Sequence, residues 1–342
     1  MTTLRARAAA LDLGRVSRPE FMTARRRRGI ALTLLYLLIC LIWGTTWIGI
    51  KYGVETIPPL TAAGLRFLVA FPLLILVVHR WPGAQLRYPP GKGGLFAFVT
   101  VVYLIVPYAL LNVGEQSITS GLTAILFSSV SAFLVIFAWL LLGTRITLRQ
   151  WSGVLLGMSL LSILILIGEG GLGVSNAWAP VAVLAAAMLH GLSYIVIRKH
   201  GEGVHSLTLE ALPIGAAGLI LTVGGMLLES PDLASVSGKS ALGILYLAAI
   251  PSVVGFAVYF YLLKRIEPVT LSFVFIFFPA IALGVSAVAE SASLPALSLL
   301  IVAGMLVALA LTKRRDEPVE DGAAPAADAA LPAVQPVPDR TP

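Results

Sequence analysis

The chain has 342 residues, of which 58% are hydrophobic and 12% are charged, and its formal net charge is +7. The mean hydropathy is +0.93, whereas soluble domains carry roughly a quarter charged residues, so the composition excludes an ordinary soluble globular protein. The positive charge does not indicate a nucleic-acid partner, because the basic residues stand at the ends of apolar runs and not on a polar face.

The first segment in chain order, residues 1–29, is a basic tail that ends in Arg25 to Arg28. We interpret it as a cytoplasmic tail; a transit peptide or a patch for anionic lipid are the alternatives, and Asp12 and Glu20 argue against the transit peptide. The apolar run that follows is too long for the core of a cleavable signal sequence, so it is expected to remain as the first membrane span.

Apolar runs of membrane-spanning length follow one another from residue 30 to residue 311. A run of about 20 apolar residues crosses the hydrocarbon core as a helix, because a helix satisfies its own backbone polar groups there. We predict ten such helices, at residues 30–50, 60–79, 94–113, 118–142, 150–168, 176–197, 208–228, 240–263, 268–289 and 293–311. Residues 312–342 are rich in Ala and Pro and lack periodicity, which predicts a disordered C-terminal tail.

The lysines and arginines of the connecting segments predict the orientation, because positive charge near spans is retained on the cytoplasmic side. With the N-terminus inside, the outer loops hold only Lys51 and Lys239. The inner loops and the C-terminal tail hold the remaining basic residues near the spans, from Arg80 to Arg315. We therefore predict a multi-pass protein of the cell (inner) membrane with both termini cytoplasmic.

A short stretch of the first span occurs twice. Residues 43–51, WGTTWIGIK, return loosely as residues 190–198, HGLSYIVIR, 147 positions later. An odd number of predicted spans separates the two copies, so equivalent residues face opposite sides of the bilayer. This pattern predicts two inverted repeats of five helices, at residues 30–168 and 176–311, with a shared site between them.

Several segments together resemble EamA-type permeases of the drug/metabolite transporter superfamily. They lie at residues 42–70, 114–126, 141–157, 190–199, 259–273 and 289–291. Where the usual pattern has Gly-Glu after the fourth span, this chain has Gly143-Thr144, while the second copy keeps an acid in Ala289-Glu290. The resemblance implies ten helices in two inverted five-helix repeats, cytoplasmic termini and transport of small organic solutes, often outward.

Glycines and prolines within the spans carry two further expectations. Small residues let helix backbones approach closely in lipid, and we expect this of pairs such as Gly215 and Gly218 or Gly224 and Gly225. Prolines interrupt the third, eighth and ninth spans at positions 107, 251 and 279. Each proline frees a backbone carbonyl, which favours either a cavity beside the helix or a simple bend.

Three ionisable residues in the spans are candidates for proton coupling or gating, since such groups are costly in hydrocarbon and usually face inward. His190 can carry a proton or bind a substrate carboxylate, or it can be a neutral packing residue. Arg66 can attract an anionic solute, pair with Glu55, or extend its head group to the membrane interface. Glu115 lies near Asn112 at the end of the third span, as part of a polar patch or as a solvated helix end.

Two further carboxylates lie near the ends of predicted spans. Glu210 stands at the inner start of the seventh span and Glu290 at the outer end of the ninth. For both residues the sequence predicts an interfacial position.

Aromatic and polar side chains of several spans are the candidate substrate-binding residues. Trp43 and Trp47 are four positions apart and share one helix face, as do His190 and Tyr194 in the second copy. Aromatic rings can enclose an apolar solute, and their polar groups can orient it. The full set that we predict is Trp43, Trp47, Tyr103, Tyr108, Asn112, His190, Tyr194, Phe256 and Tyr259.

The sequence gives no motif for catalysis, for ATP hydrolysis or for a metal site, and Cys40 is its single cysteine. We therefore predict a secondary transporter, not an enzyme, without cofactor or metal, that exports a small metabolite such as an amino acid by alternating access. Its expected partners are that solute and membrane lipid, with no nucleic acid. The alternatives are a membrane-embedded enzyme or a lipid-handling membrane protein.

Overall fold

The computed structural model describes residues 18–168, 176, 178–263, 265, 274–291, 299–300, 302–304 and 307. Every regular element in this part of the chain is helical, as the apolar runs predict. The elements are α2 (Arg18–Gly53), α3 (Pro59–Arg80), α4 (Gly93–Phe98), η1 (Val99–Ile105), α5 (Val106–Glu115), α6 (Ser120–Phe127), α7 (Val130–Leu142), α8 (Leu148–Gly168), α9 (Trp178–His200), α10 (Ser206–Leu228), η2 (Leu233–Ser235), α11 (Gly238–Ala249), η3 (Ile250–Gly255), α12 (Phe256–Leu263) and α14 (Val274–Ala289).

Seven helical segments are long and apolar enough to cross a membrane. They are Gly29–Gly53, Pro59–Arg80, Gly93–Glu115, Ser120–Leu142, Trp178–His200, Ser206–Leu228 and Gly238–Tyr259. Each coincides with a predicted span. The helix α8 coincides with the predicted fifth span and α14 with most of the ninth, whereas the tenth lies largely outside the described residues, so the total of ten remains a prediction.

Large apolar side chains cover the outside of this bundle. Among them, Leu34, Leu76, Leu140, Leu219 and Leu227 are all exposed. In water such a surface would be costly, but in a bilayer it faces lipid. The fold is therefore that of a multi-pass membrane protein.

The predicted tails are only partly described. Residues 1–17 and 308–342 lie outside the described part of the chain, which includes the whole predicted tail at 312–342. Residues 18–29 of the predicted N-terminal tail continue α2, so this helix begins well before the apolar run.

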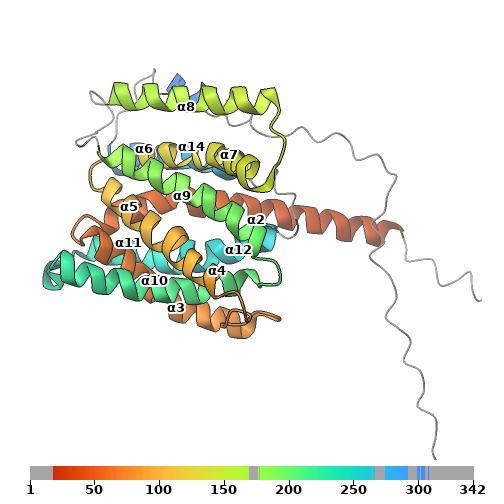
Figure 1. Cartoon of the computed structure of the whole chain (residues 1–342), viewed down its shortest axis with the longest axis horizontal. Coiled ribbons are helices and arrows are strands. Elements are labelled where there is room, and N and C mark those ends of the chain that lie inside the picture. Colours follow the sequence, from red (N-terminus) through yellow and green to blue (C-terminus); the bar gives the residue numbers. More distant parts are fainter. Residues whose placement is uncertain are drawn as a thin grey trace, which may run out of the picture.

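Among the described elements, the helices α3 and α10 form the most extensive helix pair and lie side by side (Figure 1). They are antiparallel, because the start of α3 meets the residue that follows α10. Glycines of α10 make this possible: a Cβ on Gly218 would lie 2.8 Å from the backbone nitrogen of Leu68, and one on Gly225 would lie 2.7 Å from that of Thr61. Close packing is thus the role of Gly215, Gly218 and Gly225, whereas Gly224 has nothing within 4 Å.

In each half of the chain, the first span packs against helices of the other half. The first span of the first half, α2, packs on α11 and α14 of the second half. The first span of the second half, α9, packs correspondingly on α5 and α7 of the first half. Since α3 and α10 are equivalent helices and antiparallel, the architecture is two inverted repeats packed across a central interface.

Each end of the α3–α10 pair is tied by a hydrogen bond between the halves. At the end where α3 begins, hereafter the Pro59 end, the Glu229 carboxylate accepts from the backbone nitrogens of Leu60 (2.8 Å) and Thr61 (2.9 Å). At the other end, hereafter the Arg80 end, the Tyr88 hydroxyl donates to the carbonyl oxygen of Leu209 at 2.8 Å. The halves therefore contact each other at both ends, with the site between them.

The third and eighth spans each contain a π-helical segment, η1 and η3, next to a proline. Pro107 is the second residue after η1, and Pro251 lies within η3. A proline cannot donate to the helix ladder and crowds the preceding turn, and the wider π-turn relieves both problems. Pro279, in contrast, lies inside the α-helix α14. The π-segments are frequent at functional sites because they redirect nearby side chains.

Candidate functional site

The first span of each half contributes two side chains to one central cavity. Trp43 and Trp47 come from α2, and His190 and Tyr194 come from the equivalent positions of α9. The structure thus brings together the two pairs that share a helix face in the sequence. Their role in solute binding stays a prediction.

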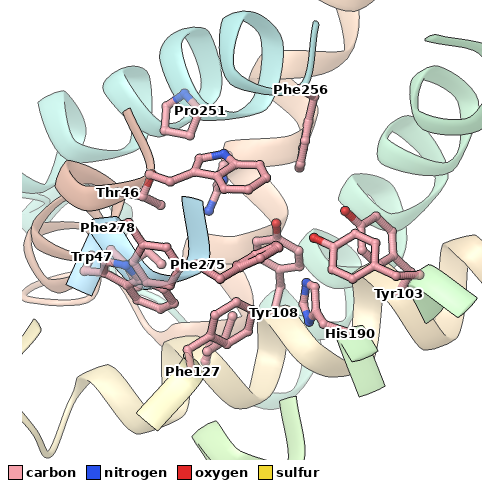
Figure 2. A pocket seen from close by; sticks show the side chains of 15 residues that line it. Thr46, Trp47, Tyr103, Tyr108, Phe127, His190, Pro251, Phe256, Phe275 and Phe278 are labelled. Carbon is pink, nitrogen blue, oxygen red and sulfur yellow. The ribbon is translucent and has the colours of Figure 1, made fainter. Parts of the chain in front are cut away.

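The imidazole of His190 lies in an aromatic enclosure (Figure 2). The centre of its ring is 5.0 Å from that of Phe127, 5.1 Å from that of Tyr103 and 5.6 Å from that of Tyr108. Its Nδ1 atom lies 3.0 Å from the carbonyl oxygen of Ala186. Because a carbonyl can only accept, Nδ1 carries a proton, and Nε2 remains as the ring atom that can accept a hydrogen bond in the neutral form.

The guanidinium of Arg66 also faces the cavity. Its Nε donates to the hydroxyl of Ser252 at 3.0 Å, and its central carbon lies 5.0 Å from the centre of the Tyr108 ring. Arg66 is 2% exposed, so the interpretation that its head group extends to the interface is wrong. The interpretation that it pairs with Glu55 is also wrong, because Glu55 forms its ion pair with Lys239.

The π-segments position the residues on either side of Arg66. Ser252 lies within η3, and its hydroxyl donates to the carbonyl oxygen of Leu247 at 2.9 Å, five residues earlier. On the opposite side, Tyr103 lies within η1 and Tyr108 follows shortly after Pro107. Pro251 of the eighth span therefore lines a cavity, one of the two possibilities that the sequence left open, whereas Pro107 of the third span is not part of the lining and precedes the lining residue Tyr108.

The cavity has a volume of about 60 Å³ and is lined mainly by aromatic side chains from both halves. The lining residues are Trp43, Thr46, Trp47, Ile50, Arg66, Tyr103, Tyr108, Leu111, Phe127, His190, Tyr194, Pro251, Phe256, Phe275 and Phe278. At roughly 10–15 Å³ for each water in this kind of measure, the space holds about four to six waters. It suits a small solute in this conformation.

Three predicted site residues do not line this cavity. The amide of Asn112 donates to the carbonyl oxygen of Tyr108 at 2.7 Å, one turn earlier in its own helix. The ring of Tyr259 packs against Trp43 with 4.8 Å between ring centres, behind the lining. Glu115 is fully buried near the Pro59 end, so the interpretation of a solvated helix end is wrong.

Lining residues that sequence reasoning missed are mostly apolar. They include Phe127, Phe275 and Phe278, which pack on Trp47, on Trp43 or on each other. No signal in the sequence separates them from lipid-facing phenylalanines. Thr46, which lies between Trp43 and Trp47 in the sequence, is a polar lining residue that was also missed. Its hydroxyl donates to the carbonyl oxygen of Ile42 at 2.8 Å.

Lys51, Glu210 and Glu290 also lie near the ends of spans and do not line the cavity. The ammonium of Lys51 donates to the carbonyl oxygens of Glu115 (2.7 Å) and Ile118 (2.9 Å). The Glu290 carboxylate accepts from the backbone nitrogen and hydroxyl of Ser120, at the start of α6. Glu210 is 1% exposed, which corrects the prediction that it is interfacial.

The described lining of the cavity contains no Asp or Glu side chain. Within the described residues, no three His, Cys, Asp or Glu side chains are close enough together to hold a metal ion. Glu115 and Glu210 do not line the cavity with His190, so the cluster that a membrane-embedded enzyme would need is not formed there.

The sequence matches the model of a known protein family. The model of the EamA-like transporter family matches the chain twice, at residues 30–168 and 177–314. The chain belongs to this family. It is an EamA-like membrane transporter of the drug/metabolite type, with the family domain present in tandem.

Individual relatives agree with this assignment. The EamA-like chain is 33% identical over 288 residues to "Protein PagO" of Salmonella typhimurium, which covers 83% of this chain and 93% of that protein. It is 27% identical over 246 residues to a "Probable amino-acid metabolite efflux pump" of Escherichia coli, with 68% and 78% covered. A solved structure described as "Crystal structure of protein" superposes with a TM-score of 0.62 at 17% identity, over 82% of this chain and 96% of that one, and supports the fold.

Proposed function

We propose that this EamA-like protein is a secondary transporter that exports a small organic metabolite, an amino acid or a related compound, by alternating access. The observation that carries the proposal is the aromatic cavity between the two inverted halves, to which both contribute side chains. In transporters built from inverted repeats, a site at the repeat interface becomes open to either side when the halves move against each other.

The predicted binding residues that line the cavity are Trp43, Trp47, Tyr103, Tyr108, His190, Tyr194 and Phe256. Their rings provide apolar walls for the solute, and their hydroxyl, indole and imidazole groups can orient it. His190 and Arg66 are the polar candidates within the lining. Asn112, Tyr259 and Glu115 lie outside the lining and are not among the proposed contacts of the solute.

Three observations support the proposed class of solute: the volume of the cavity, the chemistry of its walls and the similarity of the chain to a related protein. In this conformation the cavity has room for about four to six waters, which favours a small metabolite over a large drug. The aromatic walls favour a solute with an apolar portion. The similarity to a probable amino-acid metabolite efflux pump points to the same class and to the outward direction.

The proposed orientation places the Arg80 end of the bundle in the cytoplasm and the protein in the cell (inner) membrane. This end carries Arg80, and the described loop beyond it carries Arg87 and Lys92. The Pro59 end has few basic residues, of which Lys239 is paired with Glu55. By the positive-inside rule both termini are cytoplasmic.

The test is transport by the purified full chain in proteoliposomes, with a labelled panel of amino acids and related small metabolites. We expect movement of at least one panel member above that in protein-free liposomes, and uptake of the same solute by everted membrane vesicles, as required of an exporter. If no member moves, with or without an imposed proton gradient, the proposed function is overturned.

A matched pair of variants ties the transport to the cavity. Leu111 lines the cavity and is buried, whereas Leu140 is exposed on the lipid-facing surface of α7. We expect Leu111→Trp to fill the cavity and abolish transport, and Leu140→Trp to leave it unchanged. Equal activity of the two variants, each confirmed as a single monodisperse species, would contradict a solute path through this cavity.

A further inference from the structure

Arg66 is a buried cation without a matching anion. Its side chain is 2% exposed, and its Nη1 atom has no hydrogen-bond partner in the described part of the chain. The carboxylates of the described residues form no ion pair with it, since the ion pair found there joins Lys239 and Glu55. An unpaired buried charge is costly, and a ligand that supplies the opposite charge removes this cost.

The guanidinium is held in place by groups that leave one side of it available. Ser252 accepts from Nε and gives its own hydroxyl hydrogen to the carbonyl oxygen of Leu247. The rings of Phe67 and Tyr108 lie 5.6 Å and 5.0 Å from the guanidinium carbon. Nε is therefore occupied by Ser252 and the two rings lie against the guanidinium, whereas Nη1 is left without a partner among the described residues.

Arg66 makes the described lining of the cavity positively charged. Of the described residues that line it, Arg66 is the only one with a permanent charge, and none is Asp or Glu. A carboxylate matches a guanidinium in shape and can accept two parallel hydrogen bonds from it. An organic cation would meet a like charge and no carboxylate in the same space.

We propose that Arg66 is the carboxylate-binding residue of the cavity, and that the protein therefore selects solutes with one carboxylate and an apolar or aromatic portion over organic cations. The carboxylate would lie against the terminal nitrogens of Arg66, and the remainder of the solute against the rings around His190. Ser252 is a positioning residue, because it touches the arginine. The inference rests on the proposed transport function and names its substrate class.

The test compares phenylalanine with three analogues, each of which lacks one of its two charged groups. Phenylalaninamide and phenethylamine lack the carboxylate, whereas 3-phenylpropionate lacks the ammonium. Binding to the purified full chain is followed by the change in tryptophan fluorescence, since Trp43 and Trp47 line the cavity. We expect the two carboxylates to bind about ten- to a hundredfold more tightly than the amide and the amine, the range for a charge-assisted hydrogen bond.

Variants then assign the selectivity to the arginine. Arg66→Gln is expected to weaken binding of 3-phenylpropionate about ten- to a hundredfold. Binding of phenethylamine, which is a cation at neutral pH, is expected to become tighter, because the like charge is removed. The matched control is Arg80→Gln in the same helix, at an exposed position, which is expected to bind like the wild type. Arg66→Lys keeps the positive charge but cannot donate two parallel hydrogen bonds to a carboxylate. Its affinity for 3-phenylpropionate is expected to lie between those of the wild type and Arg66→Gln.

Ser252→Ala and Ser252→Thr keep the inference testable if Arg66→Gln does not fold. Loss of the hydroxyl is expected to raise KM for the carboxylate with little change in kcat, and Thr is expected to restore it. Equal binding of acid, amide and amine by the wild type, or unchanged 3-phenylpropionate binding by Arg66→Gln, would overturn the inference. If the wild type moves phenylalanine and its amide equally well, transport stands and this inference alone fails; if it moves no solute of the panel, both fail.

Discussion

The first spans of the two halves place their side chains alike and differ in chemistry. Trp43 and Trp47 on α2 and His190 and Tyr194 on α9 occupy equivalent positions and line the same cavity. One pair carries indoles, and the other carries an imidazole and a phenol. The two halves thus hold side chains at equivalent places in the cavity, but each half supplies different hydrogen-bonding groups.

The second spans show the same division more sharply. Thr61 and Thr208 lie 147 positions apart, and each is hydrogen-bonded to the half opposite, by way of Glu229 and Gln85 respectively. Yet 147 positions after Arg66 the chain has Pro213, so the charge of the cavity comes from one half alone. Contacts that hold the halves together are shared between the repeats, whereas the polar group that we assign to ligand binding is not.

The largest effect is expected where the halves touch most closely. Gly225 and Gly224 are neighbours in α10, but a Cβ on Gly225 would lie 2.7 Å from the backbone nitrogen of Thr61, while one on Gly224 meets nothing within 4 Å. We expect Gly225→Ala to cost about 2–3 kcal/mol of stability through overpacking. Gly224→Ala is expected to gain up to about 1 kcal/mol, because alanine is the better helix former.

Thermal unfolding of the two purified variants in the same detergent measures this difference. Because the substitution is identical and the positions are adjacent, the comparison isolates the contact between α3 and α10. Equal melting temperatures would show that this contact is not the rigid part of the interface.

The next effect compares the equivalent residues of the first spans. His190→Phe keeps the aromatic packing and removes the imidazole, so we expect solute affinity to fall about tenfold, as for one hydrogen bond. Trp43→Phe keeps an aromatic wall with less area, and we expect a loss of about threefold. Fluorescence titration of the remaining tryptophans, or competition with a labelled solute, gives both values.

Equal losses for the two variants would contradict the division of roles between the halves. A control for packing is available in the melting temperature of each variant, since His190→Phe also removes the hydrogen bond to the carbonyl oxygen of Ala186. A fall in affinity without a comparable fall in melting temperature assigns the effect to the solute.

The sequence was sufficient for the helices and for part of the site. Runs of apolar residues predicted the seven long helices, and the spacing of four predicted that Trp43 and Trp47 share a face, as do His190 and Tyr194. These inferences succeed because helix length and helix periodicity are local properties. The prolines predicted a bend or a cavity, but the wider π-turns could not be derived from them, since the backbone has several ways to satisfy the freed carbonyl.

The other part of the site depends on contacts between distant segments. Phe277 and Phe278 are adjacent and chemically identical, yet one is 52% and the other 1% exposed. A helix with apolar residues on all sides gives no signal for the side that faces the interior. In the same way, the burial of Arg66 depends on Ser252, which lies 186 residues later and reaches it through the π-segment η3. The sequence therefore indicated the charge but not its partner.

A smaller effect is expected at the carboxylates that cap helices of the other half. Glu229 accepts from two backbone nitrogens at the start of α3, in the manner of a helix cap. Glu229→Gln keeps the size of the side chain but removes its negative charge from the helix N-terminus. We therefore expect the free energy of unfolding to fall by about 1 kcal/mol. Glu202→Gln in an exposed loop is the matched control, and thermal unfolding is the measurement. A loss no larger than that of the control would show that the tie at the Pro59 end is dispensable.

The smallest effect is expected from the ion pair between Lys239 and Glu55, although it also joins the two halves. The Lys239 ammonium lies 3.0 Å from the carboxylate, but the two side chains are 50% and 48% exposed. Solvent screens such a pair and its ordering costs side-chain entropy, so Lys239→Ala is expected to cost at most about 0.5 kcal/mol. A double-mutant cycle with Glu55→Ala measures the coupling directly. A coupling larger than the loss from Glu229→Gln would mean that exposed charges, and not buried caps, hold this end of the halves together.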